Sequence, residues 1–230
     1  MSVVPRREIR RRLDLSITNP ESLVITPLLQ RKEILEELPD SDSIDLRLGT
    51  HFLLPQVPPV PFTYPCKGSA SKSHIRVHVP LGSYLVVPAH ETVLGSTLEF
   101  IKMPGDLSGE ILTKSSVART FTVIETAPWI HPNYRGCLTL EIANASNTPL
   151  ILYPGRLIAQ LILLKLLDTE ASEGKLSGTY LAPIYPEAPT FADPIDDLQG
   201  IGIPKKQFRS PYQGHKRERI ERRGTRRPRS

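Results

Sequence analysis

The sequence predicts an all-β fold, either a barrel or a sandwich, with short helices at its N-terminal end. Between residues 43 and 164, short runs of β-branched and other apolar residues recur about every ten residues, and no helical period separates them. Gly, Pro and Asn punctuate these runs, as expected for turns between strands. Proline supplies 23 of the 230 residues, about twice its usual share, and it disfavours helix interiors. These observations argue against a helical bundle.

Two helices are expected before the first strand. Residues 2–16 are expected to form a short helix, and LQRKEILEEL (29–38) has the i, i+3, i+4 apolar spacing of an amphipathic helix, with Pro39 after its end. The N-terminal arginines are not followed by the apolar core of a secretory signal, and no run reaches the roughly 18 apolar residues of a membrane span. We therefore expect a soluble, cytoplasmic protein.

The expected strands begin at residue 43. SIDLRLG (43–49) and IRVHV (75–79) alternate apolar and polar residues, which is the pattern of a strand with one buried face. The later runs are more uniformly apolar. Together the expected strands are 43–49, 75–79, 83–87, 91–100, 109–114, 121–126, 137–142 and 156–164.

Composition divides the chain into three parts. Residues 1–167 hold the β pattern, 168–208 form a proline-rich irregular segment that wraps over the surface or links to the tail, and 209–230 form a basic tail. Eleven Lys or Arg and two Glu lie between Lys205 and Ser230. This tail is expected either to be a solvated, disordered end or to contact nucleic acid through unspecific electrostatic attraction.

The sequence lacks the signatures of several nucleotide-dependent and metal-dependent chemistries. The chain contains no Walker-type phosphate loop, no dinucleotide-binding glycine motif and no zinc-deaminase motif. Cys66 and Cys137 match neither a disulfide framework nor a zinc cluster, so both are expected to be reduced. His74 and His78 would share one face of a strand, and both are expected to be solvated surface residues rather than metal ligands. No protein-bound metal site is therefore predicted.

KSSVAR (114–119) follows a strand and combines hydroxyl groups with cations. If the segment turns helically, Ser115 and Arg119 share a face. Hydroxyls, backbone N–H groups and a guanidinium can together hold phosphate oxygens. The alternative is that a serine caps the helix and Arg119 is a surface charge.

Glu141 lies in CLTLEI (137–142), where strict alternation turns it away from the apolar face. A carboxyl group in a half-buried pocket can have a raised pKa and carry protons, whereas an exposed one is only a surface charge. IHPNYRG (130–136) has the composition of a hairpin loop and brings Tyr134 and Arg135 close to that strand. Tyr134 is expected either to pack against a nucleoside or to be a packing tyrosine.

Taken in order, a series of segments resembles the motifs of the dCTP deaminase branch of the trimeric dUTPase superfamily. The resemblance covers roughly residues 20–165. Each segment alone has little specificity, whereas the ordered series is strongly specific. The segments are SIDLRLG, ETVLGSTLEF, KSSVAR, ETAPWIHPNYRG, LTLEIAN and LYPGRLIAQL.

The resemblance implies a distorted β-barrel or jelly-roll protomer and a homotrimer whose three active sites lie between subunits. It also implies a zinc-free conversion of dCTP to dUTP and ammonia, with Mg²⁺ bound through the triphosphate. In the family, the glutamate that matches Glu141 acts as general acid and base while water attacks C4 of cytosine. The serine that matches Ser115 positions this water.

The resemblance further implies a set of substrate-binding residues. Ser116 and Arg119 match positions that support the triphosphate and the site across the subunit boundary, and Lys114 lies near the phosphates. Thr126 and Ala127 match the hairpin that lies against the base.

The sequence departs from the family pattern at three places. His131 stands where dUTPases have the aspartate that orients the attacking water, which weakens a dUTPase assignment, although a neutral imidazole still accepts a hydrogen bond from water. Lys114 stands where deaminases commonly have arginine, which keeps the charge but loses the bidentate fork. SPYQGHK (210–216) resembles the closing C-terminal segment of the family displaced downstream, with Tyr212 and Gln213 as expected substrate contacts.

The sequence thus predicts a dCTP deaminase-like enzyme. One alternative is a dUTP pyrophosphatase, acting alone or combined with deamination. The other is a non-catalytic nucleotide-binding barrel whose basic tail binds nucleic acid.

Overall fold

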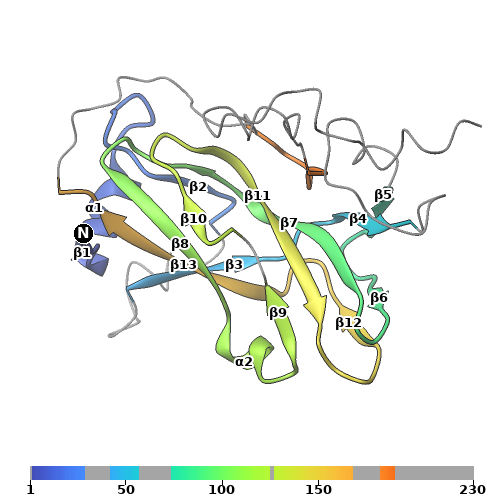
Figure 1. Ribbon diagram of the computed structural model, residues 1–230. Helices are drawn as coiled ribbons and strands as arrows, with labels where there is room; N and C mark the ends of the chain where they lie inside the picture. The colour runs from blue at the N-terminus through green and yellow to red at the C-terminus, as the bar shows by residue number, and fades with distance from the viewer. Residues whose placement is uncertain (1, 29–41, 57–73, 125–126, 168–181, 190–230) are drawn as a thin grey trace, which may run out of the picture.

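The computed structural model describes residues 2–28, 42–56, 74–124, 127–167 and 182–189. These residues form many strands and two short helices (Figure 1), so the all-β prediction is confirmed. The helices are α1 (Arg6–Asp14) and α2 (Ser115–Ala118). The strands are β1 (Ser2–Val3), β2 (Val24–Thr26), β3 (Ser43–Arg47), β4 (His51–Pro55), β5 (His74–His78), β6 (Leu85–Val87), β7 (Thr92–Lys102), β8 (Leu107–Thr113), β9 (Thr122–Ile124), β10 (Trp129–Ile130), β11 (Arg135–Asn144), β12 (Leu150–Leu152) and β13 (Leu157–Lys165).

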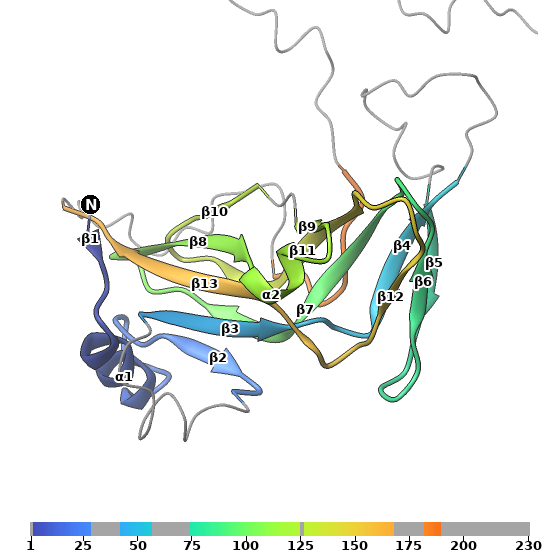
Figure 2. The ribbon, with the colours of Figure 1, turned by 90° about the horizontal axis from the view of Figure 1, so that it is seen from below.

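Two large antiparallel sheets and one small one organise these strands (Figures 1 and 2). The first sheet has the order β1-β13-β8-β10, with β3 also paired to β13. The second has the order β5-β4-β7-β11-β9, with β2 also paired to β7, and β6 pairs with β12 in a two-stranded sheet. Among the described strands, each order runs from one edge to the other without returning, so these strands do not form a closed barrel.

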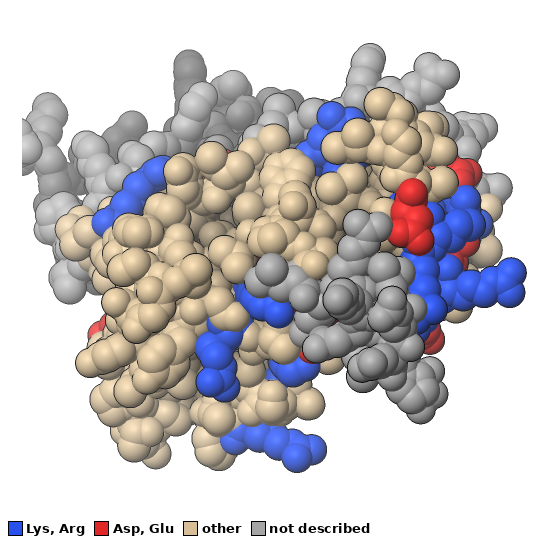
Figure 3. Space-filling model, turned by 180° about the vertical axis from the view of Figure 1, so that it is seen from behind, with Lys and Arg blue, Asp and Glu red and all other residues tan. Residues whose placement is uncertain are grey.

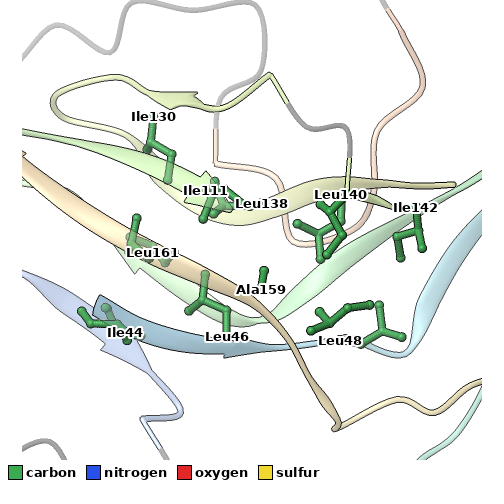
Figure 4. Close-up of a cluster of buried hydrophobic side chains, with 14 of the residues drawn as sticks. Ile44, Leu46, Leu48, Ile111, Ile130, Leu138, Leu140, Ile142, Ala159 and Leu161 are labelled. Carbon is green, nitrogen blue, oxygen red and sulfur yellow. The ribbon is translucent and has the colours of Figure 1, made fainter. Parts of the chain in front are cut away.

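Residues of both large sheets meet in one apolar core (Figure 4). Leu46 of β3, Leu140 and Ile142 of β11, and Leu161 of β13 are fully buried there. Burial of each such side chain stabilises the fold by roughly 1.5–3 kcal/mol. Because side chains alternate along a strand, burying Leu140 and Ile142 turns Glu141 to the opposite face of β11.

Each expected strand coincides with an observed strand, and the differences lie at the ends. The sequence missed β1, β2, β4, β10 and β12, none of which exceeds five residues. Several are defined by distant partners, since β1 pairs with β13 and β12 pairs with β6. Short strands of this kind carry too few residues for a periodic signal.

The N-terminal helix is shorter than the expected span of 2–16. Ser2–Val3 is used as a strand, and Pro5 is the N-cap of α1. The helix expected at 29–38 lies outside the described residues. Within the described part of the chain, no helix combines the length and the apolar composition that crossing a membrane requires.

Arg12 fastens α1 to the rest of the domain. Its side chain is buried, and its guanidinium donates to Glu8 Oε1 at 2.7 Å and to Asp106 Oδ1 at 2.9 Å. It also donates to the backbone oxygen of Glu21 at 3.1 Å, while the exposed Arg11 pairs with Glu8 and Glu21. Figure 3 shows acidic and basic side chains side by side at this end of the molecule.

Candidate active site

Glu141 lies on β11, which pairs with two other strands of the second sheet. β11 pairs with β7 along one edge, where Glu141 lies opposite Leu94, and with β9 along the other edge near its end. The alternation of β11 places Thr139 and Glu141, both half-buried, on the face opposite the core. This part of the sequence prediction agrees with the structure.

A pocket of about 470 Å³ opens over this face of β11. Its volume lies within the range of roughly 300–1,000 Å³ typical of small-molecule sites. It brings together three of the predicted site residues, Ala127, Tyr134 and Glu141. The other lining residues are His74, Thr92, Leu94, Leu138, Thr139, Pro183, Glu187 and Pro189.

Tyr134 forms one wall of this pocket and is fixed by its hydroxyl group. The Tyr134 hydroxyl donates to the backbone oxygen of Cys137 at 2.8 Å. Burial raises the pKa of Tyr134 above its ordinary value, and the electrostatic effects of Cys137 and Glu187 act in the same direction. The phenol therefore stays neutral at physiological pH, and the ring serves as a packing surface that also faces the pocket.

Residues 182–189, which we call the strap, form another wall of the pocket. The strap lies beside β11 (Figure 1), where Cys137 N donates to Pro183 O at 2.6 Å and Glu187 N donates to Thr139 Oγ1 at 3.2 Å. Pro183, Glu187 and Pro189 all line the pocket. The sequence predicted an irregular segment here, but nothing in its pattern predicted contact with β11.

The residues predicted to hold phosphate lie elsewhere on the protomer, at α2. Ser115, Ser116 and Arg119 are exposed there, and none of them lines the pocket that contains Glu141. Ser116 instead lines a separate pocket of about 290 Å³ together with Arg156. In Figure 1, α2 and β9 lie near the end of β11, whereas the strap lies near its beginning.

Lys114 precedes α2 and is held by an ion pair. Its Nζ lies 2.5 Å from Asp45 Oδ2, and Gln160 Nε2 donates to Asp45 Oδ1 at 3.2 Å. Asp45 and Gln160 face each other across β3 and β13. The ammonium of Lys114, the residue just before α2, is therefore paired with a carboxylate of the same protomer.

Of the remaining four predicted site residues, the structure describes only His131. His131 is exposed in the turn between β10 and β11 and does not line the pocket of Glu141. Thr126, Tyr212 and Gln213 lie outside the described residues. The closing segment predicted at 210–216 and the nucleic-acid contact predicted for the tail therefore stay predictions.

The structure also places three of the histidines and one of the two cysteines. His74 lines the pocket, and the rings of His51 and His78 lie 4.7 Å apart. Cys137 is buried and free, whereas Cys66 lies outside the described residues. In the described ranges, no cluster of three or more His, Cys, Asp or Glu side chains could hold a metal ion.

Sequence reasoning missed several pocket residues, and only some carried a signal. Thr139 shares the face of Glu141 by simple alternation and could have been named. Glu187 comes from an irregular segment without periodicity, so no sequence pattern could have placed it in the pocket of Glu141.

Comparison with known proteins identifies a family for this arrangement. A family model described as dCTP deaminase-like matches residues 3–166. The dCTP deaminase of Halorubrum lacusprofundi is 32% identical over 151 residues, which covers 62% of this chain and 74% of that protein. The dUMP-forming dCTP deaminase of Methanobrevibacter smithii is 30% identical over 172 residues, covering 72% of this chain and 86% of that protein.

A solved structure also shares the fold. The crystal structure of 2′-deoxycytidine 5′-triphosphate deaminase from Agrobacterium tumefaciens matches with a TM-score of 0.50 and 19% sequence identity. The match covers 70% of this chain and 48% of that chain, and at this identity it supports the fold alone. Because the family model spans most of the chain, this protein belongs to the dCTP deaminase-like family.

Proposed function

We propose that this protein is a dCTP deaminase that converts dCTP and water to dUTP and ammonia. One observation carries the proposal, namely that a chain of this family places Glu141 in a mostly apolar pocket of nucleoside size. Ala127, which is expected at the base, and Tyr134, which is expected against the nucleoside, line the same pocket.

The proposed chemistry requires a group that both takes and gives a proton. Water adds to C4 of cytosine while N3 is protonated, and the C4–N bond then breaks as ammonia leaves and C4 becomes a carbonyl. We propose that Glu141 accepts the proton from water and passes it to the base, which is general acid and base catalysis by one carboxyl group. Ser115 would position the water.

We propose that the site is completed by a neighbouring copy of the chain in a homotrimer. Support comes from α2, whose exposed Ser115, Ser116 and Arg119 lie apart from the pocket of Glu141. Further support comes from large apolar side chains that stay exposed on β6, on β12 and beside them, where an interface would cover them. These side chains are Tyr84, Val86, Ile151 and Tyr153.

We propose that Mg²⁺ reaches the site through the triphosphate. The described residues offer no cluster of protein ligands, and Mg²⁺ is commonly held by phosphate oxygens and water with few protein contacts. The ion would neutralise phosphate charge, and the exposed Arg119 guanidinium can bind phosphate oxygens directly. A deoxynucleoside triphosphate substrate also suits the predicted cytoplasmic location.

Turnover measurements test this proposal. The purified protein is incubated with dCTP and Mg²⁺, and ammonia and the nucleotide product are followed. Glu141→Gln is expected to lower kcat about 100-fold or more, since general acid and base catalysis contributes roughly 10²–10⁴-fold. Glu91→Gln removes a charge from an exposed turn outside the pocket and serves as the control. Full activity in folded Glu141→Gln protein would contradict the role of this carboxylate.

A second candidate is deamination combined with pyrophosphate release. The Methanobrevibacter smithii relative is named as dUMP-forming, and so are several others. His131 in place of an aspartate argues against it, because an imidazole does not replace the field of a carboxylate. Pyrophosphate release from dCTP or dUTP, measured beside ammonia release, separates the two candidates.

A further inference from the structure

The strap brings a second carboxylate, Glu187, to the pocket of Glu141. Both residues line the same cavity, one from the strap and one from β11. Glu187 is half-buried, and its charge contributes to the raised pKa of the Tyr134 phenol, which lines the same pocket. The carboxylate therefore lies near the pocket rather than on an open surface.

Backbone contacts fix the position of Glu187. Its N–H donates to Thr139 Oγ1 at 3.2 Å, two residues before Glu141 on β11. Upstream, Pro183 accepts from Cys137 N at 2.6 Å, and the Tyr185 ring lies 4.4 Å from the His51 ring. A strap held at Pro183, Tyr185 and Glu187 presents the Glu187 side chain from a defined position.

Close packing at Gly136 reinforces this position. Its φ is 147°, and a Cβ at this residue would lie 2.5 Å from Pro183 Cδ and 2.8 Å from Pro183 O. Only glycine adopts this backbone conformation readily and leaves room for the strap. The chain thus uses a glycine where Pro183 of the strap packs closely against β11.

The hydrogen-bonding groups of cytosine and uracil suggest which of the two a second carboxylate would favour. Cytosine carries an amino donor at C4, whereas uracil carries a carbonyl acceptor there. An ionised carboxylate only accepts hydrogen bonds. A fixed carboxylate near C4 therefore favours the amino-pyrimidine and opposes the oxo-pyrimidine that deamination produces.

We infer that Glu187 is a specificity-determining residue that accepts a hydrogen bond from the 4-amino group of the substrate and disfavours the 4-oxo product. This inference rests on the proposed deaminase function. Glu141 moves protons, whereas Glu187 selects the base and favours release of product. The amino group leaves as ammonia, so the attraction to Glu187 ends when the reaction is complete.

Base selectivity in Glu187→Gln tests this role. The assay compares the KM for dCTP with the inhibition constant of α,β-imido-dUTP, whose phosphate bridge resists hydrolysis. A glutamine amide can donate to a 4-oxo group, so the ratio of inhibition constant to KM is expected to fall about tenfold or more, given the strength of hydrogen bonds to charged groups. Glu187→Asp is expected to keep most of the wild-type ratio, and Glu91→Gln all of it.

The possible outcomes separate this inference from the proposed function. Equal changes in both constants, or no change in either, would assign Glu187 a merely structural role and overturn the inference. Wild-type protein that does not turn over dCTP would overturn the proposed deaminase function itself. Thermal melting confirms that each variant is folded, which is expected because the strap is anchored by backbone groups rather than by the carboxylate.

Discussion

Mixing two inactive variants is expected to restore activity, because the residues that they lack lie on different parts of the protomer. Glu141→Gln removes the carboxylate from the pocket, and Arg119→Ala removes the exposed guanidinium at α2, outside that pocket. If a site takes Glu141 from one subunit and Arg119 from the next, a mixed trimer rebuilds an intact site. Neither variant alone can do so.

The expected recovery follows from the symmetry of a closed ring. Each of the three sites needs one subunit with an intact Glu141 followed by one with an intact Arg119. After random mixing of equal amounts, each condition is met about half of the time, so about one quarter of the sites are native. The maximal rate should therefore approach about one quarter of the wild-type value and decline as the mixture departs from equal amounts.

Ammonia release after dissociation and reassociation of the mixture measures this recovery. Each variant is carried through the same treatment alone as a control. A tag on one variant allows mixed trimers to be isolated, which verifies that the subunits exchanged. Mixed trimers without activity would show that the site lies within one subunit, and the proposed role of α2 would be wrong.

Three further predictions concern the strap and α1. Gly136→Ala places a Cβ 2.5 Å from Pro183 Cδ. The resulting strain of about 1–3 kcal/mol should displace the strap and raise the KM for dCTP. An unchanged KM would argue against the strap as a pocket wall. Arg12→Met leaves Glu8 and Asp106 without a buried partner and should cost about 3 kcal/mol in urea denaturation, near the lower end for a buried pair because both carboxylates keep some exposure; a loss no greater than that of the exposed control Arg11→Met would contradict it. Hydrogen bonds from Arg11 and Arg12 lower the pKa of Glu8 from its ordinary 4.5 to about 2, so this contribution to stability is complete above pH 4.5 and is lost toward pH 2. The melting temperature should therefore fall less steeply between pH 5 and pH 2 in Glu8→Gln than in the wild-type protein. Equally steep curves for the two proteins would exclude Glu8 as the cause.

The sequence predicted those parts of the molecule that depend on local periodicity. The alternation of 137–142 located Glu141 on the face away from the core, and the helical turn at KSSVAR agrees with α2. Both features depend on neighbouring residues, whose arrangement a strand or a helix fixes.

The sequence could not predict contacts between distant segments. Asp45 pairs with Lys114 across 69 positions, and Glu187 reaches Thr139 across 48. Neither contact leaves a periodic trace, because tertiary packing alone brings the two segments together. The strap therefore appeared only as an irregular segment, although it supplies a wall and a carboxylate to the pocket.

The Lys114 ion pair bears on the departure from the family pattern that the resemblance indicates at this position. Asp45 accepts from both Lys114 and Gln160, so it is matched by one ammonium and one amide. A compact ammonium is sufficient for such a single contact, whereas the planar fork of arginine is needed for bidentate phosphate binding. Arg119, which forms no ion pair with any described residue, keeps its fork available. We infer that Lys114 anchors the start of α2 to β3 and that Arg119 is the cation which meets the phosphates.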